Sequence, residues 1–216
     1  MFQLVSDRLL TAPSFTFLLI CRYHSVEVIY GLLYAAGGQS SEGVLDSIER
    51  YDPNTDTWTT VQSMSSPRMY HGLAEMDGFL FAIGGHSGRS RLKSVEFYDP
   101  ATNQWTAACP MNIARSVAGV ASLGGSIYVA GGYDGKDYLN SVECYNIKLN
   151  KWLSCPSMNG RRSALGLVAY NGCLYACGGF DGSFQSSVEK FVPGTELWEN
   201  CVSMSLGKVH FAISCT

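Results

Sequence analysis

The chain has 216 residues, and its composition already excludes several classes of function. A chain of this length can bury about 70% of its unfolded surface, so it can support a core of its own. Its formal net charge is −3, and it contains no run of Lys and Arg. It therefore lacks the electrostatic footprint of a protein that binds nucleic acid or an anionic membrane, and we exclude both partners.

Residues 1–21 stand outside the pattern that fills the rest of the chain. Their apolar run, from Ser14 to Cys21, is far shorter than the roughly 20 apolar residues that a membrane span needs. Asp7 cancels Arg8 before that run and no small-residue cleavage site follows it, so the segment does not resemble a signal peptide. We interpret residues 1–21 as an extension unrelated to the domain that follows.

From residue 22 onward the chain is a tandem repeat. Pairs of adjacent glycines recur every 47 residues, and each pair is followed by an aromatic residue, a tryptophan, a methionine and a cation. The spacing of these later positions falls to 46 residues in the last unit. A period of roughly 20 to 50 residues is typical of solenoids, propellers and arrays. The recurring positions are Gly37-Gly38, Gly84-Gly85, Gly131-Gly132 and Gly178-Gly179; Tyr51, Tyr98, Tyr145 and Phe191; Trp58, Trp105, Trp152 and Trp198; Met64, Met111, Met158 and Met204; and Arg68, Arg115, Arg162 and Lys208.

Each unit predicts four short β-strands, because apolar and polar residues alternate between turn signals and show no helical period. In the unit that begins at Arg68 the strands, named a to d in chain order, are expected at 71–75, 79–83, 94–98 and 105–108. Asp77-Gly78 supplies the positive φ of a tight a–b hairpin. Asp99-Pro100 favours a c–d turn, because proline presets φ. The unit is therefore predicted to be a four-stranded antiparallel sheet.

The order of residues in each unit resembles the kelch repeat. In the unit that begins at Arg68, the arginine is followed by an aliphatic strand ending in Gly-Gly, then by Ser-Val-Glu-x-Tyr-Asp-Pro, a tryptophan and Pro-Met, and the other units keep this order with substitutions and with Ser-Met in place of Pro-Met. The resemblance covers residues 22–216 and is greatest to the C-terminal kelch propeller of the BTB-kelch (kelch-like) substrate adaptors of cullin ubiquitin ligases. It implies an all-β propeller in which each repeat is one blade and about six blades close a ring.

The chain departs from that pattern at both ends. It holds four units, at about 22–67, 68–114, 115–161 and 162–207, followed by one extra strand at 208–216. We therefore predict an incomplete ring of four blades, whose end sheets keep unpaired edges.

One face of the propeller is the expected binding face. Because the strands alternate in direction, the d–a and b–c connections share one face, and the a–b and c–d turns share the other. The b–c loops differ between units in charge, aromatic content and length, and variable loops on a rigid scaffold commonly carry binding residues. The predicted partner-binding residues are His86, Arg89, Tyr133, Asp134, Phe180 and Phe184 in the b–c loops, and Arg68, Tyr70, Arg115, Ser116, Arg162 and Ser163 where strand a begins.

The recurring arginines have two interpretations. Guanidinium groups near the channel mouth can bind carboxylates through paired hydrogen bonds, and the resemblance implies that they help to bind acidic peptides. Alternatively, they are structural and pair with the recurring glutamates at positions 49, 96, 143 and 189. Lys208 would offer a point charge where the others offer a fork. The glycine pairs are interpreted as sites of close backbone approach, and the tryptophans as core between blades.

The cysteines indicate a reducing compartment. Cys173 and Cys177 share one face of a strand about 13 Å apart, too far to form a disulfide bond. With Cys144 and Cys155 they are interpreted as buried free thiols in apolar strands. We therefore predict a cytoplasmic location.

The function expected from the sequence is protein recognition without catalysis. The resemblance implies the substrate-recognition part of a cullin-RING ubiquitin ligase adaptor, which binds the cullin through a BTB domain that these 216 residues do not contain. A cytoskeletal scaffold that binds actin is the alternative, and a copper oxidase is a remote one because the four histidines are scattered. No cofactor, metal or catalytic residue is predicted.

Overall fold

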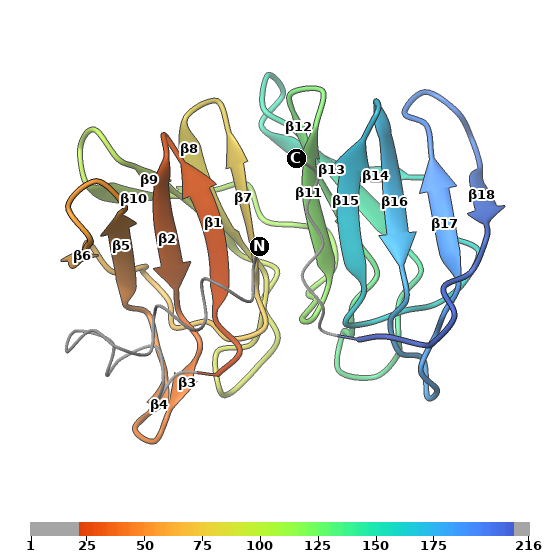
Figure 1. The fold of residues 1–216 in the computed structure, drawn as a ribbon, viewed down its shortest axis with the longest axis horizontal. Helices are drawn as coiled ribbons and strands as arrows, with labels where there is room; N and C mark the ends of the chain where they lie inside the picture. Colours follow the sequence, from red (N-terminus) through yellow and green to blue (C-terminus); the bar gives the residue numbers. More distant parts are fainter. Residues whose placement is uncertain (1–21, 210–216) are drawn as a thin grey trace.

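The computed structural model describes residues 22–209. The predicted extension at 1–21, most of the extra strand predicted at 208–216, and His210 lie outside the described residues. Within them the chain is all-β, and every large sheet is antiparallel and four-stranded (Figure 1). The prediction of the fold class is confirmed.

Each four-stranded sheet is one blade. Blade 1 contains β1 (Ser25–Ile29), β2 (Leu32–Ala36), β5 (Ile48–Asp52) and β6 (Thr57–Val61), and its b–c loop forms the small hairpin β3 (Gln39–Ser40) and β4 (Gly43–Val44). Blade 2 contains β7 (Gly72–Met76), β8 (Phe79–Ile83), β9 (Val95–Asp99) and β10 (Gln104–Ala108). Blade 3 contains β11 (Gly119–Leu123), β12 (Ser126–Ala130), β13 (Val142–Asn146) and β14 (Lys151–Cys155). Blade 4 contains β15 (Gly166–Tyr170), β16 (Cys173–Cys177), β17 (Val188–Phe191) and β18 (Trp198–Cys201).

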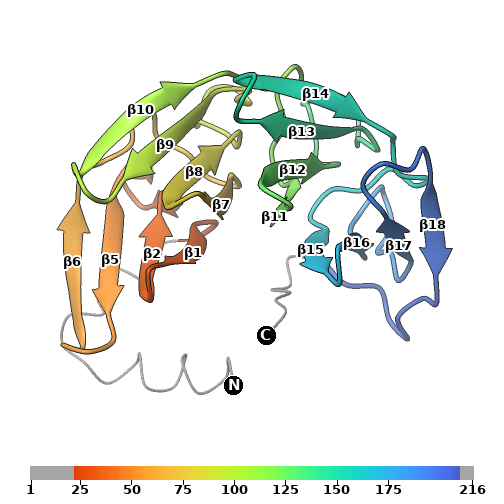
Figure 2. The ribbon, with the colours of Figure 1, turned by 90° about the horizontal axis from the view of Figure 1, so that it is seen from above.

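The strands predicted for blade 2 agree with β7 to β10 to within one residue, and their order across the sheet is a, b, c, d. The blades stand side by side in an arc, with β1, β7, β11 and β15 on its inner side (Figure 2). Along this inner side β1 contacts β7, β7 contacts β11, and β11 contacts β15. Within residues 22–209 the sheets do not close a ring, as predicted, and blades 1 and 4 flank the open side (Figure 2).

The core lies between neighbouring blades. Alternate residues of each strand point to opposite faces of its sheet, so β8 contributes Leu80 to the cluster shared with blade 1 and Phe81 to the cluster shared with blade 3. The indole nitrogen of Trp152 donates to the carbonyl of Cys109 in the preceding blade at 2.8 Å, and Trp105 and Trp198 make equivalent bonds. The interpretation of the tryptophans as core between blades is confirmed for these three.

The c–d turns recur because a side-chain bond closes them. The hydroxyl of Tyr98 donates to the carboxamide oxygen of Asn103 at 2.8 Å, and Tyr145 does the same to Asn150. Both asparagines have positive φ, a conformation that asparagine tolerates better than most residues. The aromatic residue therefore anchors its own turn as well as filling the core.

The glycine pairs bring the next blade close. Gly84 has a φ of +61°, and a Cβ at that position would lie 2.6 Å from the carbonyl oxygen of Arg115. The amide of Gly85 donates to that same carbonyl at 2.9 Å. Any side chain at Gly84 would therefore separate blades 2 and 3, which confirms the interpretation of close backbone approach.

The cysteines are less buried than predicted. Cys177 is buried, but Cys144, Cys155 and Cys173 are partly exposed free thiols. The burial predicted for those three is wrong, because they lie on β13, β14 and β16 where neighbouring residues cover them incompletely. Residues 22–209 contain no helix with the length and hydrophobicity of a membrane span.

Candidate functional site

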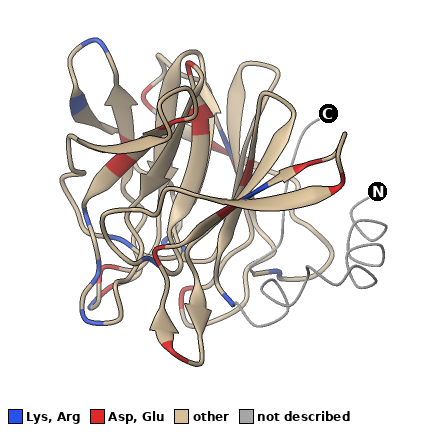
Figure 3. Ribbon diagram, turned by 90° about the vertical axis from the view of Figure 1, so that its left-hand side faces the viewer, with Lys and Arg blue, Asp and Glu red and all other residues tan. Residues whose placement is uncertain are grey.

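The d–a and b–c connections meet on one face, as the strand directions predict. Isolated β-bridges join Met69 to His86, Ser116 to Tyr133 and Ser163 to Phe180, so the residue after each arginine pairs with the first residue of a b–c loop. We call this surface the loop face. Charges of both signs are interspersed along the ribbon in the view of Figure 3.

The three arginines are not part of that surface. Arg68, Arg115 and Arg162 are each 1% exposed. Their guanidinium groups pair with Glu96 at 2.9 Å, Glu143 at 2.8 Å and Glu189 at 2.5 Å. The prediction that they bind a partner directly is wrong, and the structural alternative, in which they pair with the recurring glutamates, is confirmed at these three positions.

Each arginine makes hydrogen bonds to two neighbouring blades. The backbone carbonyl of Arg115 accepts from Gly85 in blade 2, while its guanidinium donates to the carbonyl of Gly131 at 2.8 Å in blade 3. Burial lowers the pKa of Arg115, and the charge of Glu143 opposes that change. Because the ordinary pKa of arginine exceeds 12, the group stays charged, and its charge is balanced inside the scaffold.

Ser116 and Ser163 are also structural. Both are buried, and their hydroxyls donate to the carbonyls of Tyr133 at 3.3 Å and Phe180 at 3.1 Å. These bonds fix the base of each b–c loop. Their predicted direct role in binding is therefore wrong for Ser116, whereas Ser163 still lines a hollow described below.

The b–c loops place a row of aromatic rings across blades 3 and 4. Tyr133 lies 5.2 Å from Tyr138, Tyr138 lies 5.7 Å from Phe180, and Phe180 lies 5.5 Å from Phe184, measured between ring centroids. Arg91 from blade 2 extends the row, since its guanidinium carbon lies 4.4 Å from the Tyr133 centroid. We call these five residues the aromatic row. Three of them, Tyr133, Phe180 and Phe184, were predicted site residues.

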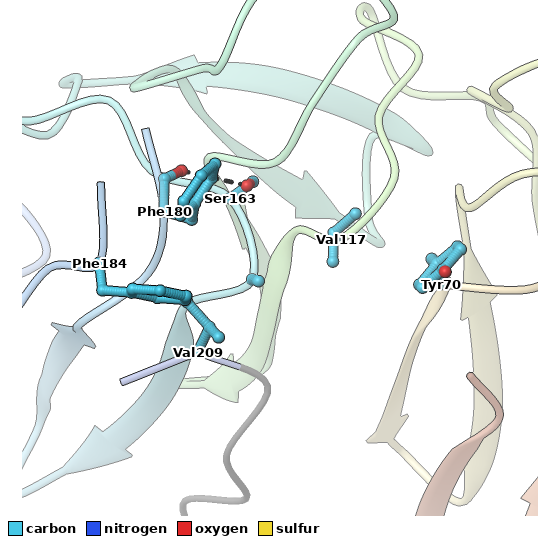
Figure 4. A pocket seen from close by; sticks show the side chains of 7 residues that line it. Tyr70, Val117, Ser163, Phe180, Phe184 and Val209 are labelled. Atoms are coloured by element: carbon cyan, nitrogen blue, oxygen red, sulfur yellow. Dashed lines mark hydrogen bonds between the residues drawn. The ribbon is translucent and has the colours of Figure 1, made fainter. Parts of the chain in front are cut away.

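A hollow of about 290 Å³ opens beside the end of the aromatic row (Figure 4). Phe180, Phe184 and Ser163 line it on the side of blade 4, and Tyr70 of blade 2 and Val117 of blade 3 line it on the other side. Its walls are mainly apolar. Phe184 is 67% exposed, so a large apolar ring is available for contact at the rim of a mainly apolar hollow, and binding pockets are mostly concave and apolar.

The remaining predicted residues have distinct environments. The carboxylate of Asp134 accepts from the backbone amides of Asp137 and Lys136, bonds that lower its pKa and that brace its own loop. Nδ1 of His86 accepts from the amide of Gly88 at 3.0 Å. Arg89 is exposed.

Tyr70, where strand a of blade 2 begins, lies close to another tyrosine. Burial raises the pKa of Tyr70, and Tyr23, whose ring centroid lies 4.2 Å away, raises it further, to about 12.

Arg91 and Tyr138 were missed by the sequence analysis. Both occur at the end of a b–c loop, and each is bridged to the first residue of the same loop. The usable signal was that a cation and a ring stand at corresponding ends of loops in adjacent units.

The inner side of the arc holds a buried histidine. His71 is 5% exposed and lines a second hollow of about 170 Å³ together with Tyr70 and Val117. Burial lowers its pKa to about 3, and the charges of Arg68 and His24 act in the same direction. His71 is therefore neutral at pH 7.

This pKa predicts a pH-dependent stability. The unfolded chain binds a proton at His71 near pH 6.5, whereas the folded chain binds it near pH 3, so acidification favours the unfolded state between those values. Lowering the pH from 7 to 5 should cost roughly 2 kcal/mol through this group. Urea unfolding of the wild type at both pH values measures this loss of unfolding free energy. His71→Leu is the comparison variant, because it removes the titrating group and because Leu165 occupies the equivalent position in blade 4. Equal losses of unfolding free energy in the two proteins would contradict the role of His71.

The groups on the loop face are suited to binding a protein partner. Among residues 22–209 no three His, Cys, Asp or Glu side chains gather closely enough to hold a metal ion. What the loop face does offer is a set of aromatic rings, exposed cations and an apolar hollow, and Tyr and Arg are frequent energetic anchors of protein interfaces.

Comparison with known proteins agrees with the fold. The kelch motif matches four stretches, residues 20–65, 67–112, 114–159 and 161–205. A solved structure titled "Structure of YjhT" superposes with a TM-score of 0.79 at 17% identity, covering 88% of this chain and 73% of that one, which shows a shared fold. No curated protein matches the chain. Because the motif covers nearly the whole of the described residues, the chain belongs to the kelch-repeat family and is a β-propeller module for protein interaction.

Proposed function

We propose that the loop face binds a segment of a protein partner, with an apolar side chain in the hollow between Tyr70 and Phe184. The observation that carries the proposal is the exposed ring of Phe184 at the rim of that hollow. Burying a phenylalanine ring at an interface contributes about 1.5–3 kcal/mol, which is enough to make one such contact a principal anchor.

Charge sets the kind of segment. Arg68, Arg115 and Arg162 are neutralised inside the scaffold, so an acidic partner meets the exposed Arg89 and Lys136 instead. Arg91 over Tyr133 adds a cation at the edge of the aromatic row. An acidic segment with one apolar anchor is the ligand that these groups favour. Substrate recognition for a cullin-RING ubiquitin ligase, implied by the resemblance to BTB-kelch adaptors, is the cellular role that we propose for it.

A peptide selection followed by titration tests the proposal. Displayed random peptides are selected on the immobilised chain, and an enriched peptide is then titrated by fluorescence polarisation. Phe184→Ala should weaken binding about tenfold. Arg89→Ala should weaken it less, and more at low salt than at high salt.

Leu197→Ala is the matched control. Leu197 is 73% exposed and lies in the c–d turn between β17 and β18, on the opposite face. Its removal should leave the affinity unchanged. Equal weakening by Phe184→Ala and Leu197→Ala, or no weakening by Phe184→Ala, would contradict a site on the loop face.

A further inference from the structure

Three of the four blades hold a guanidinium in an identical set of acceptors. In blade 2, Arg68 donates to the carbonyl of Gly84 at 2.8 Å, to the carbonyl and hydroxyl of Ser94 at 3.0 Å each, and to Glu96 at 2.9 Å. We call such a set of glycine, serine and glutamate acceptors a cradle. The other filled cradles are Gly131, Ser141 and Glu143 around Arg115, and Gly178, Ser187 and Glu189 around Arg162.

Blade 1 has the same acceptors and no guanidinium among the described residues. They are Gly37, Ser47 and Glu49, each 47 residues before its counterpart in blade 2. The hydroxyl of Ser47 is buried and has no hydrogen-bond partner, whereas that of Ser94 receives Arg68. A buried hydroxyl without a partner costs free energy, so the cradle of blade 1 is prepared for a donor.

Glu49 gives independent support. It takes part in none of the ion pairs among the described residues, and burial raises its pKa. Glu96, Glu143 and Glu189 are all at most 2% exposed and paired. In sequence, the position 47 residues before Arg68 is Cys21, and the neighbouring Arg22 is exposed.

The cradle lies at the open end of the arc, in blade 1 (Figure 2). Val26 is 46% exposed, although its counterpart in blade 2, Leu73, is only 8% exposed beneath blade 1. The surface that a preceding blade would cover is therefore accessible to another polypeptide.

The filled cradles also define the form of the ligand. The amide three residues before each arginine donates to the second oxygen of the same glutamate: Ser65 to Glu96 at 2.8 Å, Asn112 to Glu143 at 2.7 Å, and Asn159 to Glu189 at 2.6 Å. The ligand is thus a peptide that offers one guanidinium and one backbone amide three residues earlier.

We propose that the cradle of Gly37, Ser47 and Glu49 is a binding site for an arginine side chain carried by a segment of another polypeptide. The site is separate from the hollow and from the aromatic row, because the cradle lies in blade 1, whereas the hollow and the row are formed by residues of blades 2 to 4. A guanidinium in it would satisfy Ser47 and neutralise Glu49. Charge-assisted hydrogen bonds of this kind are roughly twice as strong as neutral ones.

The chain supplies its own probe. A labelled peptide with the sequence of residues 62–68, the segment that fills the cradle of blade 2, is titrated against the full chain by fluorescence polarisation. We expect saturable binding with a dissociation constant below about 1 mM. Replacing the arginine of the peptide by alanine, or Glu49→Gln in the chain, should weaken binding at least tenfold.

The controls separate this site from the others. Glu42→Gln, which changes an exposed carboxylate in the same blade, and Phe184→Ala should leave the affinity for the peptide unchanged, so failure here is distinguishable from failure of the loop-face site. Binding that is absent, or that survives Glu49→Gln, overturns the proposal. Free L-arginine binding as tightly as the peptide also overturns it, since the site would then take a small guanidinium compound. Self-association that Lys208→Ala abolishes would place the lysine of a second copy in the cradle and exclude the arginine ligand.

Discussion

Replacing Arg115 by alanine is expected to lower the free energy of unfolding by about 3–5 kcal/mol, because it leaves Glu143 buried without its counter-charge. The pair has a distance of 2.8 Å, and neither side chain is more than 3% exposed. The measurement is equilibrium urea unfolding at pH 7. Adding Glu143→Gln to the variant should recover part of the loss, since glutamine still accepts from the amides of Asn112 and Ile113 but carries no charge.

Lys208→Ala is the matched control, because Lys208 holds the same repeat position and its side chain is exposed. Its cost should stay within about 0.5 kcal/mol. A cost below about 1 kcal/mol for Arg115→Ala would show that the ion pair does not hold blades 2 and 3 together. Loss of partner binding in an Arg115 variant would reflect unfolding, so these arginines cannot serve to map the binding face.

Trp152→Ala should cost about 3–5 kcal/mol and lower the melting temperature by roughly 10 °C. The ring is 5% exposed, lies 5.3 Å from the ring of Tyr145 between centroids, and donates to blade 2 through Cys109. Its removal therefore opens a cavity at the contact between two blades and also removes a hydrogen bond. Thermal unfolding followed by circular dichroism measures the effect.

The adjacent position provides the comparison for this prediction. Leu153 lies on the opposite face of β14 and is 43% exposed, so Leu153→Ala should cost less than about 1 kcal/mol. Similar losses of unfolding free energy for Trp152→Ala and Leu153→Ala would mean that the contact between blades 2 and 3 is not the principal source of stability. A Trp152→Phe variant should lie between the two, because phenylalanine keeps one aromatic ring in the core but loses the second ring of the indole and its hydrogen bond to Cys109.

Much of the fold could be predicted because a repeat displays its own constraints. The strands of blade 2 were located to within a residue, since alternation and turn signals recur at a fixed interval. The small hairpin β3–β4 in the first b–c loop was not predicted, because it occurs in one unit and has no counterpart to compare with. The site was predicted less well, for an opposite reason. The arginines recur, yet recurrence by itself does not show whether a cation faces solvent or a glutamate.

By itself the sequence determined the blade, the repeat interval, the antiparallel order of strands, the incomplete ring and the face on which variable loops gather. These follow from patterns with periods of two residues within a strand and 47 residues between blades. The tertiary structure alone decided which charges are buried and which groups meet. Arg115 and Glu143 are 28 residues apart in the chain, and Arg91 reaches Tyr133 from another blade. Such contacts depend on how sheets stack, and stacking is set by the packing of whole faces, which no local pattern encodes.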